Sequence, residues 1–566
     1  MIISPSADEF SGLDGSRLDG WDFSGQDLTS AELWLTSLNG ANLAAANLTS
    51  VWLTGSNLAN ANLAQANLTH ARLFQATLGG TNFDGAVINY ADLGNTVSLG
   101  FTASQLASTA SYKSRNLQGV DLAANDISGW DLSDQNLTDA QFNQATLNNT
   151  SLTGAVIVGA NFTGTTSGGF TRAQLESTAS YQAKDMRGIL LSANDLVNWS
   201  FKGQDLTNAV LNGAILNGAD FTDANVARAA FAGTTMGGLT QAQFKSTESF
   251  RSRDLRLMNL SYNDLSGWDL RGQDLKSTNL QQSALDAADF TGADLRGVFR
   301  SDLTGAIIRN TIQANGDVAG LTLIAGESLL IGDDDGVDTQ GLYGWPERRD
   351  PYPVTIRDRM EIKPGGKLQV VFDSDAWGST IRFQPGIPVE LGGVLELGFD
   401  DNIPVAAQSG RTMKIFDWTG VTPQGEFALS SQAGQIWDAS KLYTTGEISL
   451  LGISSDLTGD QQVDSEDLLN FLAKWTGSDY PSADRTWHDG DSDADGDVDS
   501  ADMLVFLSQW TGAAAAEAQS VVSVPEPSRL PIAGLGIAPL VARIRRRTWK
   551  PKKPSAMIDS KVSRLR

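Results

Sequence analysis

The sequence predicts a mainly β protein: a square β-solenoid with short helical insertions, then a β-rich domain and a small α-helical module. Three observations predict this. One large apolar residue returns at every fifth position from Leu33 to Leu93. Residues 311–450 have a different pattern, which is typical of β-strands, with turn residues at short intervals. Aspartates then alternate along two short stretches between residues 456 and 502, each followed by an apolar helical pattern.

The five-residue period predicts that the first part of the chain forms a square coil. Successive leucines at this spacing would spiral around an α-helix and would alternate between the faces of a straight strand. They keep one inward direction only if the chain turns a corner every five residues, so that four corners close a coil of roughly twenty residues. An Ala/Leu-rich helix is disfavoured because Asn, Thr and Gly recur throughout. Phe142 and Phe162, like Phe201 and Phe221, are twenty positions apart and should stack.

The repeated unit resembles the pentapeptide-repeat family, whose consensus is A-(D/N)-L-x-x. The stretches ANLAAANLTS and ANLAQANLTHARL match this unit word for word. The resemblance implies a right-handed quadrilateral β-helix, which we assign to residues 1–310.

A longer repeat is superimposed on the five-residue period. Trp130, Trp199 and Trp268 are 69 positions apart, whereas Trp21 precedes Trp130 by 109. The first module therefore holds two extra coils of twenty residues. The predicted modules cover about residues 1–99, 100–168, 169–237 and 238–310.

The five-residue period is interrupted near the start of the second, third and fourth modules by the related stretches GFTASQLASTASY, GFTRAQLESTASY and GLTQAQFKSTESF. In each, a Thr followed three positions later by a Gln predicts a capping box that opens a helix of one to two turns. A binding loop is the alternative, but threefold repetition favours an architectural role. The capping pairs are Thr102–Gln105, Thr171–Gln174 and Thr240–Gln243, and the residues expected to pack on the solenoid are Leu106, Leu175 and Phe244.

The N-terminal residues 1–10 (MIISPSADEF) have neither a basic segment nor an apolar one, so they predict no signal peptide. Aligning Trp21 with Trp130 leaves the first module without its initial half. We therefore expect the true start, with any secretion signal, to lie upstream.

Residues 311–452 are predicted to form a β-rich domain. Either the solenoid continues as a wider β-helix or a small sandwich caps it, and we favour a domain docked on the last coil because a bare last coil exposes backbone and core. The acidic stretch 332–338 (GDDDGVD) could bind a cation, although an acidic surface turn is the simpler interpretation.

Residues 453–512 carry the clearest ligand site. Hard oxygen ligands at alternate positions wrap a calcium ion, and a glycine at the sixth position permits the sharp turn. In the second loop Gly496 fills that position, whereas the first loop has Gln461 there and should bind more weakly. The second loop would use Asp491, Asp493, Asp495, Asp499 and Asp502, with the carbonyl of Asp497 at position 7. The first would use Asp456, Thr458, Asp460, Asp464 and Asp467, with Gln462 at position 7.

Each loop leads into an apolar helix, DLLNFLAKWTG or DMLVFLSQWTG. Two such units resemble a type I dockerin. The resemblance implies Ca²⁺ as cofactor and a cohesin-like partner docking on the helices. A calcium-stabilised structural element without a cohesin is the other interpretation.

Residues 513–528 are predicted to be a linker, and residues 529–566 an apolar and basic tail. The tail resembles a PEP-CTERM sorting signal, because VPEPS is followed by the apolar stretch 530–542 and then by arginines. That implies export, contact with the membrane and a sorting protease, in the cell envelope of a Gram-negative bacterium. The tail departs from the pattern because its apolar stretch is short of roughly twenty residues and contains Pro531 and Pro539. An unstructured basic tail is the alternative.

Composition excludes several kinds of chemistry. There is no cysteine, and histidine occurs only at His70 and His488, so thiol and histidine-based catalysis are not expected. No phosphate loop or nucleophile elbow is present. We therefore predict a non-enzymatic, secreted or envelope-associated scaffold or adhesion protein that binds calcium, with a cohesin-like protein or surface polysaccharide as partner and no nucleic acid.

The sequence is less consistent with two other functions. A polysaccharide-active protein would have its site in residues 311–450, yet the spacing of the acids there pairs no two of them. An acidic DNA mimic that binds gyrase would need carboxylates along the solenoid, but residues 33–83 contain no Asp or Glu although the net charge of the chain is −25. The acids of the 311–450 domain are Asp333, Asp334, Asp335, Asp373, Asp375, Glu390, Glu396, Asp400 and Asp401.

Overall fold

A computed structural model describes most of the chain up to residue 453 and little beyond it. The described residues are 14–299, 302–333, 352–372, 377–400, 403, 405–408, 410–431, 435–453, 465–473, 503 and 506. They divide into two compact units. Unit 1 comprises Met1–Leu395 and Asp417–Ala428, and unit 2 comprises Glu396–Phe416 and Leu429–Arg566.

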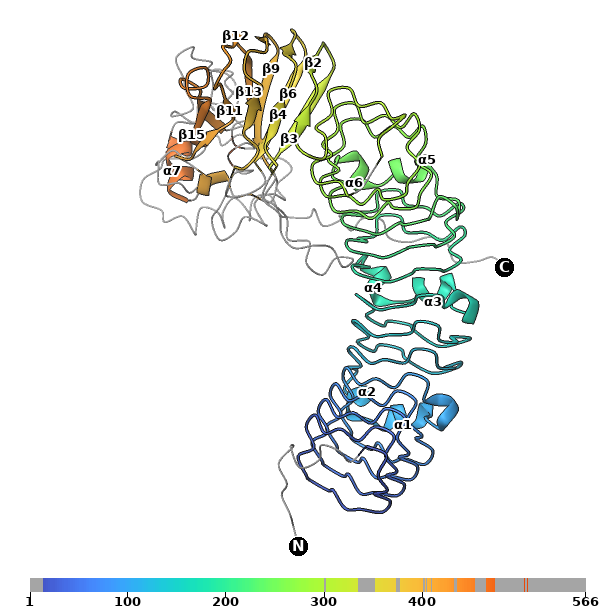
Figure 1. Ribbon diagram of the computed structural model, residues 1–566. Helices are drawn as coiled ribbons and strands as arrows, with labels where there is room; N and C mark the ends of the chain where they lie inside the picture. Colours follow the sequence, from blue (N-terminus) through green and yellow to red (C-terminus); the bar gives the residue numbers. More distant parts are fainter. Residues whose placement is uncertain are drawn as a thin grey trace, which may run out of the picture. The chain divides into compact units, whose positions relative to one another are not determined.

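The predicted square coil is confirmed. From Gly15 to Asn95 every fifth residue has a left-handed backbone, with φ near 60°. Residues twenty apart form parallel bridges, such as Glu32 with Trp52, and coils stack through backbone hydrogen bonds. Figure 1 shows these coils as successive turns of unit 1. The left-handed corner turns the chain so that each following leucine faces inward again.

The core is the continuous column that the period predicts. The large apolar residue of each five and the small residue two positions before it are buried, as in Leu33 and Ala31. Phe142 and Phe162 stack with ring centroids 5.1 Å apart, and Phe201 and Phe221 at 5.2 Å. Each large side chain removed from water in this way contributes about 1.5–3 kcal/mol.

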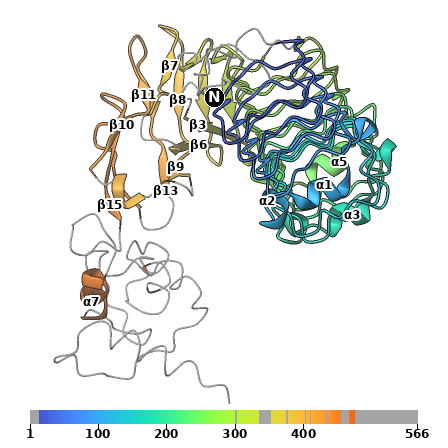
Figure 2. The same cartoon turned by 90° about the horizontal axis from the view of Figure 1, so that it is seen from below.

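Each insertion forms two short helices where the sequence predicts one. The paired coil residues Asp92 and Asp121 are 29 positions apart, so the insertion lengthens its coil by nine residues. Viewed along the stacked coils, α1, α3 and α5 lie on the same side (Figure 2). The helices are α1 (Ala103–Ser108), α2 (Ala110–Lys113), α3 (Arg172–Glu176), α4 (Ala179–Gln182), α5 (Gln241–Lys245) and α6 (Glu248–Arg251), and the 3₁₀ turns are η2 (Val97–Leu99) and η3 (Thr166–Gly168).

All three predicted capping boxes are confirmed, and Leu106, Leu175 and Phe244 are buried. The structure also explains why the third helical residue is Gln. In the first insertion the Gln105 Oε1 accepts the Thr102 N–H at 2.8 Å, while its Nε2 donates to two carbonyls of the neighbouring coil. A glutamate could make only the first contact, since a carboxylate has no N–H to donate. The same side chain therefore caps the helix and fastens it to the solenoid.

The solenoid continues as a wider parallel β-helix, which corrects our preference for a docked domain. In unit 1 the strands pair in parallel as β1–β4–β7, β2–β5–β8–β12 and β3–β6. Paired residues are 27 to 39 positions apart, as for Val354 with Ile381 and Leu321 with Met360. These strands are β1 (Asp317–Val318), β2 (Leu321–Leu323), β3 (Ser328–Gly332), β4 (Val354–Ile356), β5 (Met360–Ile362), β6 (Lys367–Phe372), β7 (Ile381–Phe383), β8 (Val389–Leu391) and β12 (Gln424–Gly425).

A side-chain contact joins the wider coils to the end of the solenoid. The side chain of Asn310 bonds both backbone groups of Thr322, donating to its carbonyl at 2.7 Å and accepting its N–H at 2.9 Å. The first wide coil therefore lies against the last narrow coil, in the place where a separate cap was expected.

Unit 2 contains an antiparallel sheet in the order β10–β15–β14. Its strands are β10 (Thr412–Lys414), β14 (Gln435–Asp438) and β15 (Glu447–Ile453); it also contains η4 (Val405–Gln408) and α7 (Ser465–Ala473). Three strands extend across the division between the units, namely β9 (Val394–Phe399), β11 (Phe416–Asp417) and β13 (Ala428–Ser431). In the part of the chain that the structure describes, no helix has the length and apolar character needed to cross a membrane.

Candidate functional site

Of the predicted calcium ligands, only Asp467 lies among the described residues. It is the third residue of α7, fully buried, at the helix start where the twelfth position of a loop should fall. Phe471 of the same helix contacts Phe506 of the second predicted unit, with ring centroids 5.2 Å apart. Among the described residues, no three acidic or histidine side chains lie so that they could hold a metal ion together. Outside the described residues lie Asp491, Asp493, Asp495, Asp497, Asp499, Asp502, Asp456, Thr458, Asp460, Gln462 and Asp464, as do the linker and the tail.

The acids of the β-rich domain are placed only in part. Glu390 is exposed in the middle of β8. Asp333 is buried, and its carboxylate accepts the backbone N–H of Gly378 at 2.6 Å. Asp333 therefore serves the packing of the wide coils and is withdrawn from solvent. Glu390 lies beside Glu361 of β5 in the sheet register, on the outward face of the two strands.

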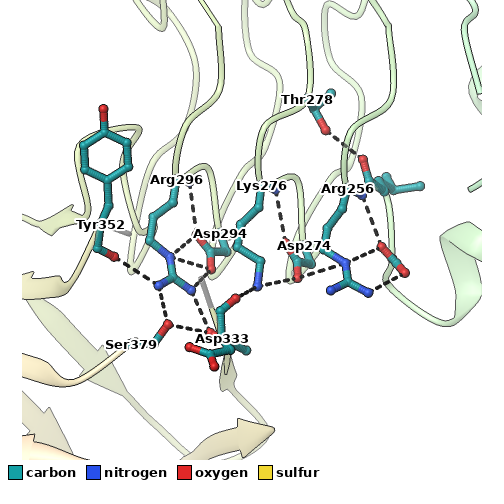
Figure 3. A network of polar contacts seen from close by, with 12 residues as sticks. Arg256, Asp274, Lys276, Thr278, Asp294, Arg296, Asp333, Tyr352 and Ser379 are labelled. Carbon is teal, nitrogen blue, oxygen red and sulfur yellow. Dashed lines mark hydrogen bonds and ion pairs between the residues drawn. The ribbon is translucent and has the colours of Figure 1, made fainter. Parts of the chain in front are cut away.

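A ladder of ion pairs leads from the last coils of the solenoid into the wide β-helix (Figure 3). In each of three consecutive coils, an aspartate is followed two positions later by a base. The pairs are Asp254–Arg256 at 2.9 Å, Asp274–Lys276 at 3.2 Å and Asp294–Arg296 at 2.6 Å. The exposed fraction of the basic side chain falls along the ladder from 34% to 6% and then to 0%. The ladder is thus increasingly covered as it approaches the wide coils.

Arg296 ends this ladder and joins three segments of the β-helix. Its guanidinium donates to the Ser379 hydroxyl at 2.6 Å, the Gly332 carbonyl at 2.8 Å and the Tyr352 carbonyl at 3.2 Å. Burial pushes the pKa of Asp294 upward, but the adjacent Arg296 outweighs it and holds that pKa below its ordinary value. Because each nitrogen of the Arg296 guanidinium donates to a partner, this contact fixes how the two coil types stack.

An open hollow of about 670 Å³ lies elsewhere, on one face of the first module. Residues of three consecutive coils line it, namely Ser50, Trp52, Thr54, His70, Ala71, Arg72, Phe74, Tyr90 and Asp92. One wall is Trp52, whose ring is 40% exposed and carries the guanidinium of Arg72 at 4.1 Å from its centroid. The two residues are bridge partners on adjacent coils. Their stacking is a cation–π contact that fixes the orientation of the indole.

The other wall is a stacked pair of rings at a corner of the coil. His70 and Tyr90 lie with centroids 4.7 Å apart and planes inclined by 19°. Both residues have left-handed backbones, so their side chains project from the corner. On the next coil Gly119 lies beneath Tyr90: a Cβ there would come within 2.0 Å of the tyrosine ring. This glycine therefore makes room for the aromatic wall.

The sequence reasoning missed this hollow, although the signal was present. Outward positions of the solenoid are usually Asn, Thr, Ser, Gln or Gly. Sixty-nine positions after His70, Arg72, Phe74, Tyr90 and Asp92, the second module has Asp139, Gln141, Asn143, Gly159 and Asn161. The aromatic residues thus occur where the second module keeps the ordinary polar pattern. Aromatic side chains at outward positions of this kind mark an interaction surface.

The family comparison agrees with the coil boundaries. Eight copies of the family "Pentapeptide repeats" match residues 13–44, 41–80, 66–96, 116–154, 136–166, 186–238 and 264–299. Residues 13–299 are therefore a pentapeptide-repeat array. The matches leave out residues 97–115, 167–185 and 239–263, which contain the three helical insertions.

Solved structures with pentapeptide repeats resemble the chain weakly. HetL, involved in heterocyst differentiation regulation in the cyanobacterium Nostoc, is 20% identical and aligns over 54% of this chain and 90% of its own, with a TM-score of 0.16. A protein from the Arabidopsis thaliana thylakoid lumen is 22% identical over 28% and 71%, with a TM-score of 0.08. QnrB1, a plasmid-mediated fluoroquinolone resistance protein, is 16% identical over 35% and 89%, with a TM-score of 0.16. No curated protein matches the chain.

Two carboxylates continue the hollow along the pentapeptide-repeat array. Asp92 lines the hollow, and Asp121 is its bridge partner on the next coil. Burial raises the pKa of Asp92, against the opposing effects of a hydrogen bond from the Gly94 N–H and of Arg72. Burial also raises the pKa of Asp121 to about 6, with a further contribution from the charge of Asp92. At neutral pH Asp92 therefore provides the hollow with a partly desolvated acceptor beside the Arg72 donor.

Proposed function

We propose that this chain is an exported, cell-envelope-associated scaffold or adhesion protein without catalytic activity, and that its pentapeptide-repeat array binds a partner through the hollow between Trp52 and Tyr90. The hollow is the observation that carries the proposal. Its aromatic walls are fixed by the coils beneath them, and a preorganised aromatic surface binds a partner with little loss of side-chain entropy.

The charge pattern favours this function over an acidic DNA mimic. Two of the three coils that line the hollow belong to the stretch 33–83, which has no acidic side chain, and the acid of the third coil, Asp92, is the bridge partner of Arg72. Farther along the array, acids are commonly paired with bases, as in Asp185 with Arg187 and Asp269 with Arg271. A DNA mimic needs a continuous row of unpaired carboxylates, so the fluoroquinolone resistance ascribed to QnrB1 is not proposed for this chain.

Partner binding by the hollow has a direct test in cosedimentation of the full chain with isolated envelopes of the native host. The double variant Trp52→Ala/Tyr90→Ala should sediment at least tenfold less than the unaltered chain, because both aromatic walls are lost. Alanine is tolerated at such a corner, since Ala45 has the same left-handed conformation.

The control variant is Trp21→Ala, which removes an indole that is 55% exposed two corners away around the coil. It should sediment like the unaltered chain. Equal sedimentation of the double variant and the unaltered chain would contradict the proposal.

The calcium module belongs to the same proposal. A buried Asp467 at the start of α7 and the contact of Phe471 with Phe506 support two loop-and-helix units packed through their helices. Bound calcium would neutralise a segment that otherwise repels itself, and would fold it into a docking or stabilising element.

Calorimetric titration of the full chain with calcium should reveal two sites of unequal affinity. Asp495→Asn should remove the tighter one, because a carboxylate at the fifth loop position becomes a neutral amide. Asp126→Asn, at an exposed solenoid position, is the matched control and should titrate normally. A titration of Asp495→Asn that matches the unaltered chain would show that the loop is wrongly assigned.

A further inference from the structure

We propose that the group bound at the hollow is a basic side chain, Lys or Arg, of a partner protein, and that it pairs with Asp92 and Asp121. This inference rests on the proposed function, because it names the partner chemistry of the same surface. It follows from a regularity of the described coils: where two aspartates stand side by side on neighbouring coils, the chain supplies a base beside them, except at this hollow.

Aspartates on neighbouring coils are normally accompanied by a base. Among the described residues, five pairs of bridge partners consist of two aspartates, namely Asp185–Asp205, Asp254–Asp274, Asp269–Asp289, Asp274–Asp294 and Asp92–Asp121. In the first four pairs a base stands two positions after the first aspartate and forms an ion pair with it. These bases are Arg187, Arg256, Arg271 and Lys276, at 2.7, 2.9, 2.7 and 3.2 Å. The three arginines also approach the second aspartate, at 3.7 to 4.0 Å, so one base serves two carboxylates.

The fifth pair lacks this base. Gly94 stands two positions after Asp92, and a Cβ at Gly94 would lie 3.0 Å from the ring of Phe74, which lines the hollow. The phenylalanine ring thus occupies the direction in which a basic side chain would leave the backbone. Arg72 does not replace the missing base. It lies on the coil before the pair, and its guanidinium is over the Trp52 ring, at 4.1 Å from the centroid.

The two carboxylates therefore keep unbalanced charge at the edge of the hollow. Each uses its Oδ1 to accept a backbone N–H of its own turn, that of Gly94 at 3.0 Å for Asp92 and that of Ala123 at 2.8 Å for Asp121. In the part of the chain that the structure describes, their Oδ2 atoms accept no hydrogen bond. Burial, and then the charge of Asp92, raise the pKa of Asp121 to about 6. A cation bound beside both carboxylates would relieve this repulsion.

The charge of the whole column also favours a cation. The bridge partners that run through the hollow and its two neighbouring coils are Glu32, Trp52, Arg72, Asp92 and Asp121. They comprise three acids and one base. This surface therefore attracts a basic partner and repels a polyanion.

The lining selects a basic side chain over a metal ion. Calcium takes about six to eight oxygen ligands, and among the described residues no three acidic or histidine side chains could hold a metal together. The hollow instead places the apolar Phe74 next to Asp92, with the hydroxyls of Ser50 and Thr54 farther along. The aliphatic stem of Lys or Arg can pack on an apolar wall while its charged end reaches the carboxylates.

Cosedimentation of the full chain with isolated envelopes of the native host tests the partner chemistry. Asp92→Asn/Asp121→Asn removes both charges and keeps the turns, because asparagine makes the same Oδ1 contact elsewhere in the array, as at Asn62. This variant should sediment at least tenfold less than the unaltered chain, since the partner's base would lose both of its counter-charges.

The matched control is Asp126→Asn/Asp131→Asn. It changes the net charge by the same amount, at two exposed aspartates whose Oδ1 atoms make the same turn contact. It should sediment like the unaltered chain. If it lost as much sedimentation as Asp92→Asn/Asp121→Asn, bulk charge rather than the hollow would explain the binding, and the inference would be wrong.

Treated envelopes identify the bound group. Acetylation of amines combined with phenylglyoxal, which modifies arginine, should abolish sedimentation of the unaltered chain. Reductive methylation, which keeps the charge of amines, should leave most of it. Proteinase treatment should abolish it as well, because the base belongs to a protein. Survival after proteinase would assign the group to a lipid headgroup or another polymer and overturn the inference.

The same assay separates failure of this inference from failure of the proposed function. Equal sedimentation of Asp92→Asn/Asp121→Asn and the unaltered chain, or sedimentation that survives acetylation with phenylglyoxal, overturns the basic side chain. In either case a loss with Trp52→Ala/Tyr90→Ala keeps the binding scaffold. If that variant also sediments like the unaltered chain, the proposed function itself fails.

Discussion

Arg296→Met should destabilise the junction between the narrow and wide coils by about 3–5 kcal/mol, because it leaves the buried Asp294 without its partner. Hydrogen exchange of the full chain, followed at the backbone N–H groups around residues 295 and 330, measures this as a loss of local opening free energy. The orphaned carboxylate is buried, so its folded-state pKa will rise above the unfolded value. Its penalty then grows as the pH rises through that window, and the defect should be smaller at pH 5 than at pH 8.

Arg187→Met is the matched control. Arg187 pairs with Asp185 two positions earlier at 2.7 Å, which repeats the local geometry of Arg296 with Asp294, but its side chain is 55% exposed. An exposed pair of this kind is worth about 0–1 kcal/mol. If the two variants cost the same, the bonds from Arg296 to Ser379 and Gly332 contribute nothing to the junction.

Comparing the sequence predictions with the structure shows which features a local sequence pattern can predict. The square coil follows from a spacing of five, because a corner at each fifth residue is a local backbone event that recurs with the same left-handed angle. The capping boxes follow for the same reason, since Thr102 and Gln105 are three positions apart and satisfy each other. Both features depend only on residues close in sequence.

Features that depend on which distant segment covers a coil were not predicted. Arg187 and Arg296 occupy the same two-residue pattern, and only the segment covering the second makes its ion pair a buried one. The wide β-helix was likewise not preferred, because its coil length varies between 27 and 39 residues and leaves no fixed period. In both cases the deciding contacts join residues that are distant in sequence.

The hollow could be predicted in part, because it depends both on the local coil period and on contacts between distant residues. Trp52, Arg72 and Asp92 are twenty positions apart, so the coil period alone places them in one column. The coil period does not predict the orientation of each side chain. Tyr90 reaches its place because the coil containing Gly119 leaves space there, and that coil follows a nine-residue insertion. The sequence therefore shows that aromatic residues stand at outward positions. It does not show that they come together around one hollow.

Phe162→Ala should cost about 3–5 kcal/mol, the usual loss when a fully buried phenylalanine is truncated. Phe162 stacks between Phe142 at 5.1 Å and Phe170 at 4.6 Å, so the cavity would open inside a continuous column of rings. The hydrogen-bonded coils on either side cannot collapse into that space, because each is held at its spacing by its own backbone bonds. Hydrogen exchange should report the loss in the second module first, since each coil contacts only its neighbours.

Phe162→Leu is the informative companion variant. Leu93 occupies the equivalent position before the first insertion, and there it is fully buried beside the same kind of helix pair. Leucine should therefore fit the backbone and cost only about 1 kcal/mol, as for a hydrophobic exchange of nearly conserved volume. If leucine proved as damaging as alanine, the stacking of Phe162 on Phe142 and Phe170, rather than burial, would be what stabilises the second module.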